Sequence, residues 1–177
     1  MTPIGHSLTG VAVALAALEP RATRRATRRV TLKLVALGVT AANVPDLPLP
    51  GWGHDRYQVS HSVFVAAAVL GGIAVAGVAA PSWRNALGGW RAYAVLAVAW
   101  LSHLLLDTFY NHGRGVALLW PVSDARLALP IPWFATAGGV PPPPNWHTLR
   151  VLLIEAFCYG AVVAIAAWLR AERIAKR

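Results

Sequence analysis

The stretch AYAVLAVAWLSHLLLDTFY, residues 92–110, decides the fold of this chain. Its 19 residues would extend about 28 Å as an α-helix, and the hydrocarbon core of a bilayer is about 30 Å thick. Because lipid offers the backbone no hydrogen-bond partners, we expect a transmembrane helix here. His103 and Asp107 interrupt this apolar run, and ionisable side chains at such depth mark functional sites in membrane proteins.

The composition of the whole chain also indicates a membrane protein. Of its 177 residues, 56% are hydrophobic and 13% are charged, whereas soluble domains carry about 25% charged residues. A soluble chain of this length would expose large apolar patches, and a disordered chain would be more polar. The composition therefore excludes both classes and predicts a single integral membrane domain over residues 1–177.

Apolar residues gather in five stretches, and we expect an all-α bundle of five transmembrane helices. The first two are the shortest, and whether the first crosses the whole bilayer is left open. No Lys or Arg precedes it, so a retained helix is expected rather than a signal peptide. Tryptophans and prolines in the long segment 111–150 predict a region on, or dipping into, the outer interface. The predicted spans are residues 3–18, 30–44, 62–80, 92–110 and 151–169.

The distribution of basic residues predicts the orientation in the membrane. One set of connecting segments, together with the C-terminus, holds 12 of the 16 Lys and Arg residues. Because cytoplasmic segments are rich in Lys and Arg, we expect the N-terminus outside and the C-terminus in the cytoplasm, in the plasma (inner) membrane. The run RATRRATRR, residues 21–29, has no interleaved aromatic residues, so membrane lipid rather than nucleic acid is the expected partner. These basic residues are Arg21, Arg24, Arg25, Arg28, Arg29, Lys33, Arg84, Arg91, Arg170, Arg173, Lys176 and Arg177.

In this topology, all six histidines fall on the outer side of the membrane. His6 opens the first stretch, Asp46 follows the second, and His61 precedes the third. His103 and Asp107 lie in the outward half of the fourth stretch. Four separate pieces of the chain therefore bring ligand-type side chains to one membrane face. Because the topology was predicted from Lys and Arg alone, this convergence is independent of it.

The i,i+4 spacing of His103 and Asp107 places both side chains on one helix face. An unpaired carboxylate at this depth is costly, so either a hydrogen bond to a neighbouring helix or a shared metal ion must compensate. The convergence of His6, Asp46 and His61 favours the metal. Imidazole with carboxylate is a ligand set for zinc and other borderline divalent ions, and a bound ion makes water a nucleophile at neutral pH.

Other polar residues are weaker candidates. His54 and Arg56 lie in a Gly/Pro-rich loop, as either solvated surface or site residues, with Arg56 a candidate for substrate binding. His112 and His147 are candidates for a second metal or for substrate. Glu155 enters the fifth stretch and is expected to be paired, with Arg150 or Arg56 as its partner. The single cysteine, Cys158, excludes an intramolecular disulfide and a Cys-rich zinc site.

The order of five motifs resembles the YdjM-type family of predicted membrane-bound metal-dependent hydrolases. The resemblance covers about the first 126 residues. That family in turn resembles zinc-dependent phospholipase C and related single-strand nucleases, which use an ordered His, Asp, His, H-x-x-x-D ligand set on phosphoesters. The motifs are G-H-S-L-T-G at His6, N-V-P-D at Asp46, S-H-S at His61, H-L-L-L-D-T at His103 and L-W-P-V-S-D at Trp120.

The resemblance implies His6, Asp46, His61, His103 and Asp107 as metal ligands, with Asp107 as the bridging carboxylate. Asp46 would be a ligand or the catalytic general base. The sequence departs from the family where Leu47 and Pro48 replace a frequent second acid, and where Arg56 replaces a histidine. One or two ions are therefore expected rather than three, and this ligand set favours zinc.

Together these features predict a membrane-bound metal-dependent hydrolase that acts on a phosphoester, with an amphiphilic lipid head group as a candidate substrate. The alternative is a protein without enzymatic activity, in which a structural metal or a His/Asp network ties the helices together. An ion or proton carrier is a third reading. Few polar residues continue toward the cytoplasmic side, chiefly Thr40 and Asn43, which argues against a conduction path.

Overall fold

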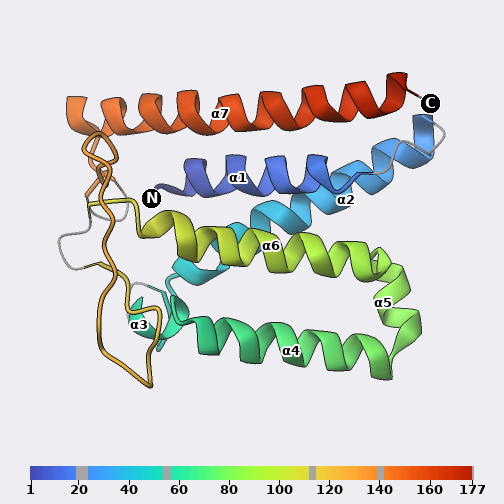
Figure 1. Cartoon of the computed structure of the whole chain (residues 1–177), viewed down its shortest axis with the longest axis horizontal. Coiled ribbons are helices and arrows are strands. Elements are labelled where there is room, and N and C mark those ends of the chain that lie inside the picture. Colours follow the sequence, from blue (N-terminus) through green and yellow to red (C-terminus); the bar gives the residue numbers. More distant parts are fainter. Residues whose placement is uncertain (19–23, 54–56, 112–114, 139–141, 177) are drawn as a thin grey trace.

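The computed structural model describes residues 1–18, 24–53, 57–111, 115–138 and 142–176. In these residues the secondary structure is helical apart from two isolated β-bridges, which confirms the all-α fold (Figure 1). There are seven α-helices and one short 3-10 helix among them. The α-helices are α1 (Pro3–Ala16), α2 (Arg24–Asn43), α3 (Tyr57–Ser60), α4 (Val63–Ala79), α5 (Pro81–Leu87), α6 (Gly89–Asp107) and α7 (Trp146–Ala175), and the 3-10 helix is η1 (Val44–Asp46).

Five of these helices correspond to the five apolar stretches of the sequence, and their bounds differ most at α2 and α7. Helix α2 begins at Arg24 and α7 runs from Trp146 to Ala175, so both extend beyond the apolar runs 30–44 and 151–169. Arg, Lys and Glu are good helix formers, and the backbone therefore stays helical where the apolar run has ended.

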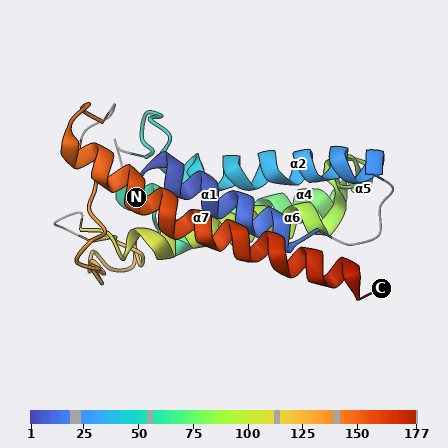
Figure 2. The ribbon, with the colours of Figure 1, turned by 90° about the horizontal axis from the view of Figure 1, so that it is seen from above.

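The long helices lie lengthwise beside one another in both views (Figures 1 and 2). Helix α1 packs against α2, α6 and α7, and α6 also contacts α2 and α4. One end of the bundle carries the N-terminus, α3 and the segment after α6. The other end carries α5, the start of α2 and the C-terminus. This arrangement gathers the start of α1, the end of α2 and the end of α6 at one end.

Two helices in the described part of the chain, α6 and α7, are long and apolar enough to cross a membrane. The pair α4 and α5 would be a third span, broken by a bend of 114° between the two helices. Helix α1 is apolar but shorter. Helix α7 exposes large apolar side chains, among them Phe157, Ile165 and Trp168, as expected of a surface that faces lipid.

Helices α1 and α2 approach closely at two glycines, Gly10 and Gly38. A Cβ atom on either residue would overlap the backbone of the other. Small residues at such a crossing allow helix backbones to come together in membranes. On either side of this crossing Ala14 packs with Leu34, and Ala42 packs with Ala99 of α6. The crossing therefore fixes α1, α2 and α6 relative to one another.

Candidate metal centre

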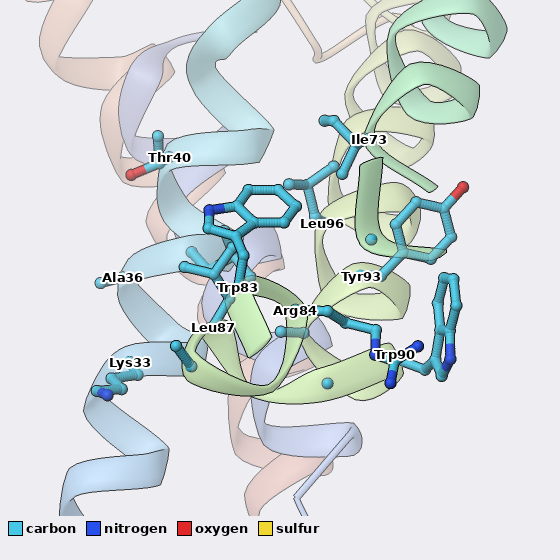
Figure 3. Close-up of a pocket in the computed structure, with 15 residues that line it drawn as sticks. Lys33, Ala36, Thr40, Ile73, Trp83, Arg84, Leu87, Trp90, Tyr93 and Leu96 are labelled. Carbon is cyan, nitrogen blue, oxygen red and sulfur yellow. The ribbon is translucent and has the colours of Figure 1, made fainter. Parts of the chain in front are cut away.

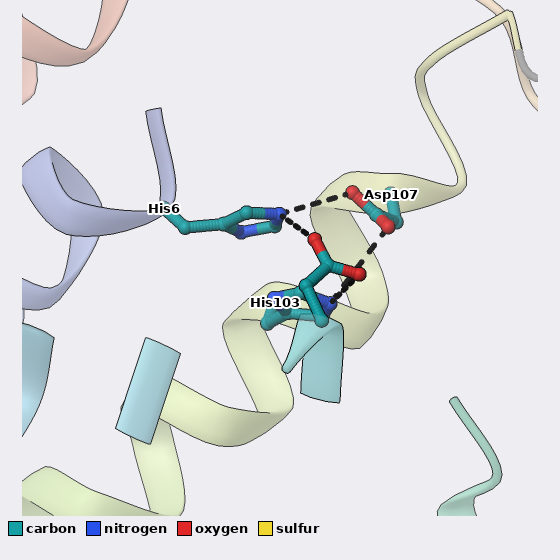
Figure 4. A group of neighbouring side chains, drawn as sticks. His6, His103 and Asp107 are labelled. Carbon is teal, nitrogen blue, oxygen red and sulfur yellow. Dashed lines mark ion pairs between the residues drawn. The ribbon is translucent and has the colours of Figure 1, made fainter. Parts of the chain in front are cut away.

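Four segments bring ligand-type side chains to one buried place. His6 lies in α1, Asp46 ends η1, His61 directly follows α3, and His103 and Asp107 lie in the last turns of α6. The three histidines are fully buried, Asp107 is 1% exposed and Asp46 is 15% exposed. Figure 4 shows His6, His103 and Asp107 pointing toward one another from α1 and α6.

The distances within this cluster are short. Nε2 of His6 is 3.4 Å from Oδ2 of Asp46 and 3.4 Å from Oδ1 of Asp107. Nε2 of His61 is 3.5 Å from Oδ1 of Asp46 and 3.2 Å from Oδ2 of Asp107. Nε2 of His103 is 3.8 Å and 3.7 Å from the same two oxygens. Donor atoms at about 2.0–2.1 Å from a tetrahedral ion would be about 3.3 Å apart, so this spacing suits a shared ion.

The backbone sets which nitrogen of His103 carries the proton. Nδ1 of His103 is 2.7 Å from the carbonyl oxygen of Ala42. A carbonyl only accepts, so this Nδ1 donates and Nε2 of His103 presents a lone pair. Nδ1 of His61 lies between two groups, the Ser60 hydroxyl at 2.8 Å and the carbonyl oxygen of Tyr57 at 3.1 Å. The two Nε2 atoms are 2.9 Å apart, so the lone pair of His103 faces either a proton on His61 or a cation held between the two rings.

His6 and Asp46 have buried polar atoms without a hydrogen bond. Within the described residues, neither ring nitrogen of His6 forms a hydrogen bond, and Oδ1 of Asp46 accepts none. Burying such atoms unpaired costs free energy. A cation bound among the five side chains would supply the missing partner. The ligand atoms of His6, Asp46, His103 and Asp107 all lie within 4.8 Å of one another, so this group could hold a metal ion.

Two further groups hold the Asp107 carboxylate, and sequence reasoning did not identify them. The N-terminal amine of Met1 is 2.9 Å from Oδ1, and the Tyr57 hydroxyl donates to Oδ2 at 2.9 Å. Burial, together with Asp107, raises the pKa of Tyr57 above its usual range, so this hydroxyl stays a donor. Tyr57 lies four residues before His61, and this helical spacing is the signal that could have identified Tyr57 as a residue of the site.

Asp46 is an anion at neutral pH. Burial raises the pKa of its carboxyl group, but the neighbouring His6 and His103 imidazoles outweigh that effect and lower the pKa to about 2. The carboxylate can therefore serve as a ligand or as a hydrogen-bond acceptor.

Of the remaining candidates for metal or substrate binding, the structure describes His147 alone. His54, Arg56 and His112 fall outside the described residues. His147 is exposed at the start of α7, where its Nε2 lies 2.9 Å from the carbonyl oxygen of Thr136, and it does not join the cluster.

Glu155 has a partner that the sequence did not suggest. In place of Arg150 or Arg56, the described residues give it Thr2, whose backbone N–H donates to Oε1 at 2.9 Å and whose hydroxyl donates to Oε2. Thr2 precedes α1 and its carbonyl accepts from the backbone N–H of His6. A carboxylate needs no basic side chain when it accepts two hydrogen bonds at a helix N-terminus.

The fold and the cluster define a class: an all-α protein with candidate membrane spans and a buried His/Asp site that could hold a metal ion. A family model described as YdjM inner membrane protein matches residues 1–172. The chain belongs to this family, which confirms the resemblance of its motifs and extends it through most of α7. No curated protein and no solved structure matches the chain.

Proposed function

We propose that this protein is a membrane-bound, zinc-dependent hydrolase of phosphoesters. The observation that carries the proposal is the convergence of three buried imidazoles and two carboxylates, in which buried polar atoms of His6 and Asp46 form no hydrogen bond within the described residues. Mixed imidazole and carboxylate donors are typical of zinc sites, and a catalytic ion keeps a position open for water. The motif order of the phosphoester-cleaving enzymes that the family resembles supports the choice of substrate.

His6, His61 and His103 would hold one or two ions through Nε2, with carboxylate oxygens from Asp46 and Asp107. When bound, such an ion supplies a Lewis acid for the phosphoester and lowers the pKa of a water molecule to about 7. Asp107 has one oxygen toward His6 and the other toward His61, which suits the role of bridging carboxylate. The hydroxyl of Tyr57 fixes its orientation.

Asp46 is the side chain that we assign to proton transfer. It is 15% exposed, whereas the other four members of the cluster are at most 1% exposed. It therefore lies where solvent and substrate would reach the cluster. As an ionised carboxylate it would accept a proton from the attacking water and orient that water toward phosphorus.

We also propose that the five long helices cross the membrane with the cluster on the extracytoplasmic side. Support comes from the charge asymmetry: α5 and the C-terminus, with their Arg and Lys residues, lie at the end of the bundle opposite the start of α1 (Figure 1). The cluster lies near the ends of α1 and α6 and therefore near one membrane surface. This depth favours an amphiphilic substrate such as a phospholipid head group.

The first test compares metal content and turnover in detergent-purified protein. We expect one or two zinc ions per chain, and hydrolysis of a chromogenic phosphodiester or of phospholipid vesicles. His103→Ala should lose both, because it removes a ligand and leaves the carbonyl of Ala42 without its donor. His147→Ala is the matched control and should retain both, since His147 is exposed and outside the cluster. Turnover that survives in His103→Ala would disprove the proposal.

Asp46→Asn separates metal binding from proton transfer. The amide keeps the shape of the side chain but accepts a proton poorly, so kcat should fall by about 10²- to 10⁴-fold. Zinc content should change little, because four other donors remain. An Asp46→Asn enzyme with unchanged kcat would remove Asp46 from the mechanism.

The near-complete burial of the histidines also suits a purely structural ion. Both roles predict that chelation destabilises the protein, by about 2.7 kcal/mol if the ion is normally present at 100 times its Kd. They differ in catalysis, because a structural site would show this loss of Tm with no turnover of any phosphoester. Thermal melting with and without chelator, measured beside the substrate screen, distinguishes the two.

A further inference from the structure

A pocket lies among α2, α4, α5 and α6 (Figure 3). Helix α5 lies at the end of the molecule opposite the N-terminus (Figure 1), and the pocket shares no lining residue with the His/Asp cluster. The pocket is a cavity of about 420 Å³. Its walls are mostly apolar and include Leu37, Ile73 and Leu96. Two tryptophans, Trp83 and Trp90, also line it and are 44% and 46% exposed. Exposed tryptophans beside an apolar surface are typical of the membrane–water interface.

Two cations line the same cavity, Lys33 from α2 and Arg84 from α5. The stem of Arg84 lies against Gly77, where an added Cβ would be 3.7 Å from its Cγ, and its guanidinium is 5.2 Å from the centre of the Trp90 ring. These contacts hold the guanidinium in place. In the described part of the chain, neither Lys33 nor Arg84 forms an ion pair with a carboxylate within 4.0 Å.

The end of the molecule around this cavity carries more basic than acidic side chains, and an anion from outside the chain would neutralise the excess. In the described part of the chain, the acidic residue in the helix ends that meet here is Glu172. The basic residues of the same helix ends include Arg29, Lys33, Arg84, Arg170, Arg173 and Lys176. Glu172 pairs with Lys176 at 3.4 Å. Anionic lipids supply such charge at a membrane surface, at about 1 kcal/mol for each nearby Lys or Arg.

We propose that the cavity binds one anionic phospholipid from the bilayer, with an acyl chain along the apolar wall and the phosphate near the cations that line it, Lys33 and Arg84. The dimensions favour a lipid over a peptide. A helix about 10 Å across would fill the cavity with about one turn, whereas an extended acyl chain is narrow and needs no hydrogen bonds. This site is separate from the proposed hydrolase site, and its test does not depend on catalysis.

Native mass spectrometry of the detergent-purified full chain tests the proposal. Phosphatidylglycerol and phosphatidylcholine with identical acyl chains are added in equal amounts. We expect one phosphatidylglycerol to be retained per chain. In Lys33→Gln/Arg84→Gln, its apparent Kd should rise about 30-fold. The matched control is Arg173→Gln/Lys176→Gln, which removes two charges from the same end but none that lines the cavity, and it should change the Kd little.

A second variant tests the acyl chain without changing charge. Ala36 lines the cavity and is exposed, so Ala36→Phe should fill the space, leave the helix intact and reduce retention of both lipids. Equal retention of the two lipids by the wild-type chain would overturn the proposal, as would equal losses in the two double variants. A dimer that forms in place of the lipid complex, and is lost in Ala36→Phe, would also overturn it by making a second copy the occupant.

Discussion

At the residue scale, the groups on the outer ring nitrogens orient the histidines of the cluster. Nδ1 of His103 donates to the carbonyl of Ala42, which turns its Nε2 lone pair inward. Nδ1 of His61 contacts the Ser60 hydroxyl and the Tyr57 carbonyl, so its Nε2 also faces the cluster. Metal-binding histidines are typically oriented by such a hydrogen bond on the other ring nitrogen. The backbone of α2 and residues of α3 therefore contribute to the site together with the ligating side chains.

Tyr57→Phe tests this supporting role. The hydroxyl of Tyr57 donates to Oδ2 of Asp107, and loss of such a hydrogen bond typically weakens metal affinity by about 10- to 100-fold. We expect that loss in a zinc titration, with an unchanged circular dichroism spectrum. Tyr93→Phe, at the other end of α6, is the control and should bind zinc as the wild type does. Equal affinity in both variants would show that Tyr57 does not orient Asp107.

Glu155→Ala tests the link between α7 and the start of α1. The buried carboxylate accepts two hydrogen bonds from Thr2, and a hydrogen bond to a charged group contributes about 1.5–3 kcal/mol. We expect a lower Tm and, because Thr2 precedes the helix that carries His6, weaker zinc binding. Glu172→Ala removes an exposed glutamate from the same helix and should cost at most about 1 kcal/mol. Unchanged zinc affinity in Glu155→Ala would leave Glu155 a stabilising role only.

At the element scale, the crossing of α1 and α2 sets the position of His6. Gly10 and Gly38 face each other there, and a methyl group on either would overlap the opposite backbone. His6 lies one turn before Gly10 on α1, so a shift of this crossing would move its imidazole away from α6.

Gly10→Ala should therefore destabilise the protein, although alanine is the better helix former. Overpacking of a close contact costs about 1–3 kcal/mol, which exceeds the gain of about 1 kcal/mol in helix propensity. Gly72→Ala in α4 is the control, because nothing lies within 4 Å of a Cβ at that position, and it should be neutral or stabilising. Thermal melting of both variants in one detergent provides the measurement, and an unchanged Tm for Gly10→Ala would contradict the tight crossing.

At the scale of the whole molecule, the cluster and the basic segments occupy opposite ends of the bundle (Figure 1). If the chain crosses the membrane as proposed, these two ends face different compartments. A fluorescent protein fused to the C-terminus should then fluoresce in the cytoplasm. Alkaline phosphatase fused after Ala128, in the segment 111–150, should be active in the extracytoplasmic space. An inactive phosphatase at Ala128 together with an active one at the C-terminus would reverse the orientation and place the cluster on the cytoplasmic side.

The sequence by itself determined the class of fold and the identity of the ligand-type residues. Apolar run length is a local property, so it predicted the helices that appear as α1, α2, α4, α6 and α7. The i,i+4 spacing of His103 and Asp107 placed both on one face of α6, since a helix repeats every 3.6 residues. The distribution of Lys and Arg predicted that His6, Asp46 and His61 lie at the same membrane face, and the motif order agreed, but neither shows which helices become neighbours.

Only the tertiary structure decided how those residues meet. The Gly10–Gly38 crossing, the carbonyl of Ala42 and the hydroxyl of Tyr57 join groups that are far apart in the sequence. Among the described residues, Thr2 and not Arg150 is the partner of Glu155. Helices α4 and α5, which meet at a bend of 114°, both line the cavity of the proposed lipid site, and no apolar pattern predicted this bend. Such contacts depend on how side chains of several helices pack together, which hydrophobic periodicity along a single helix does not specify.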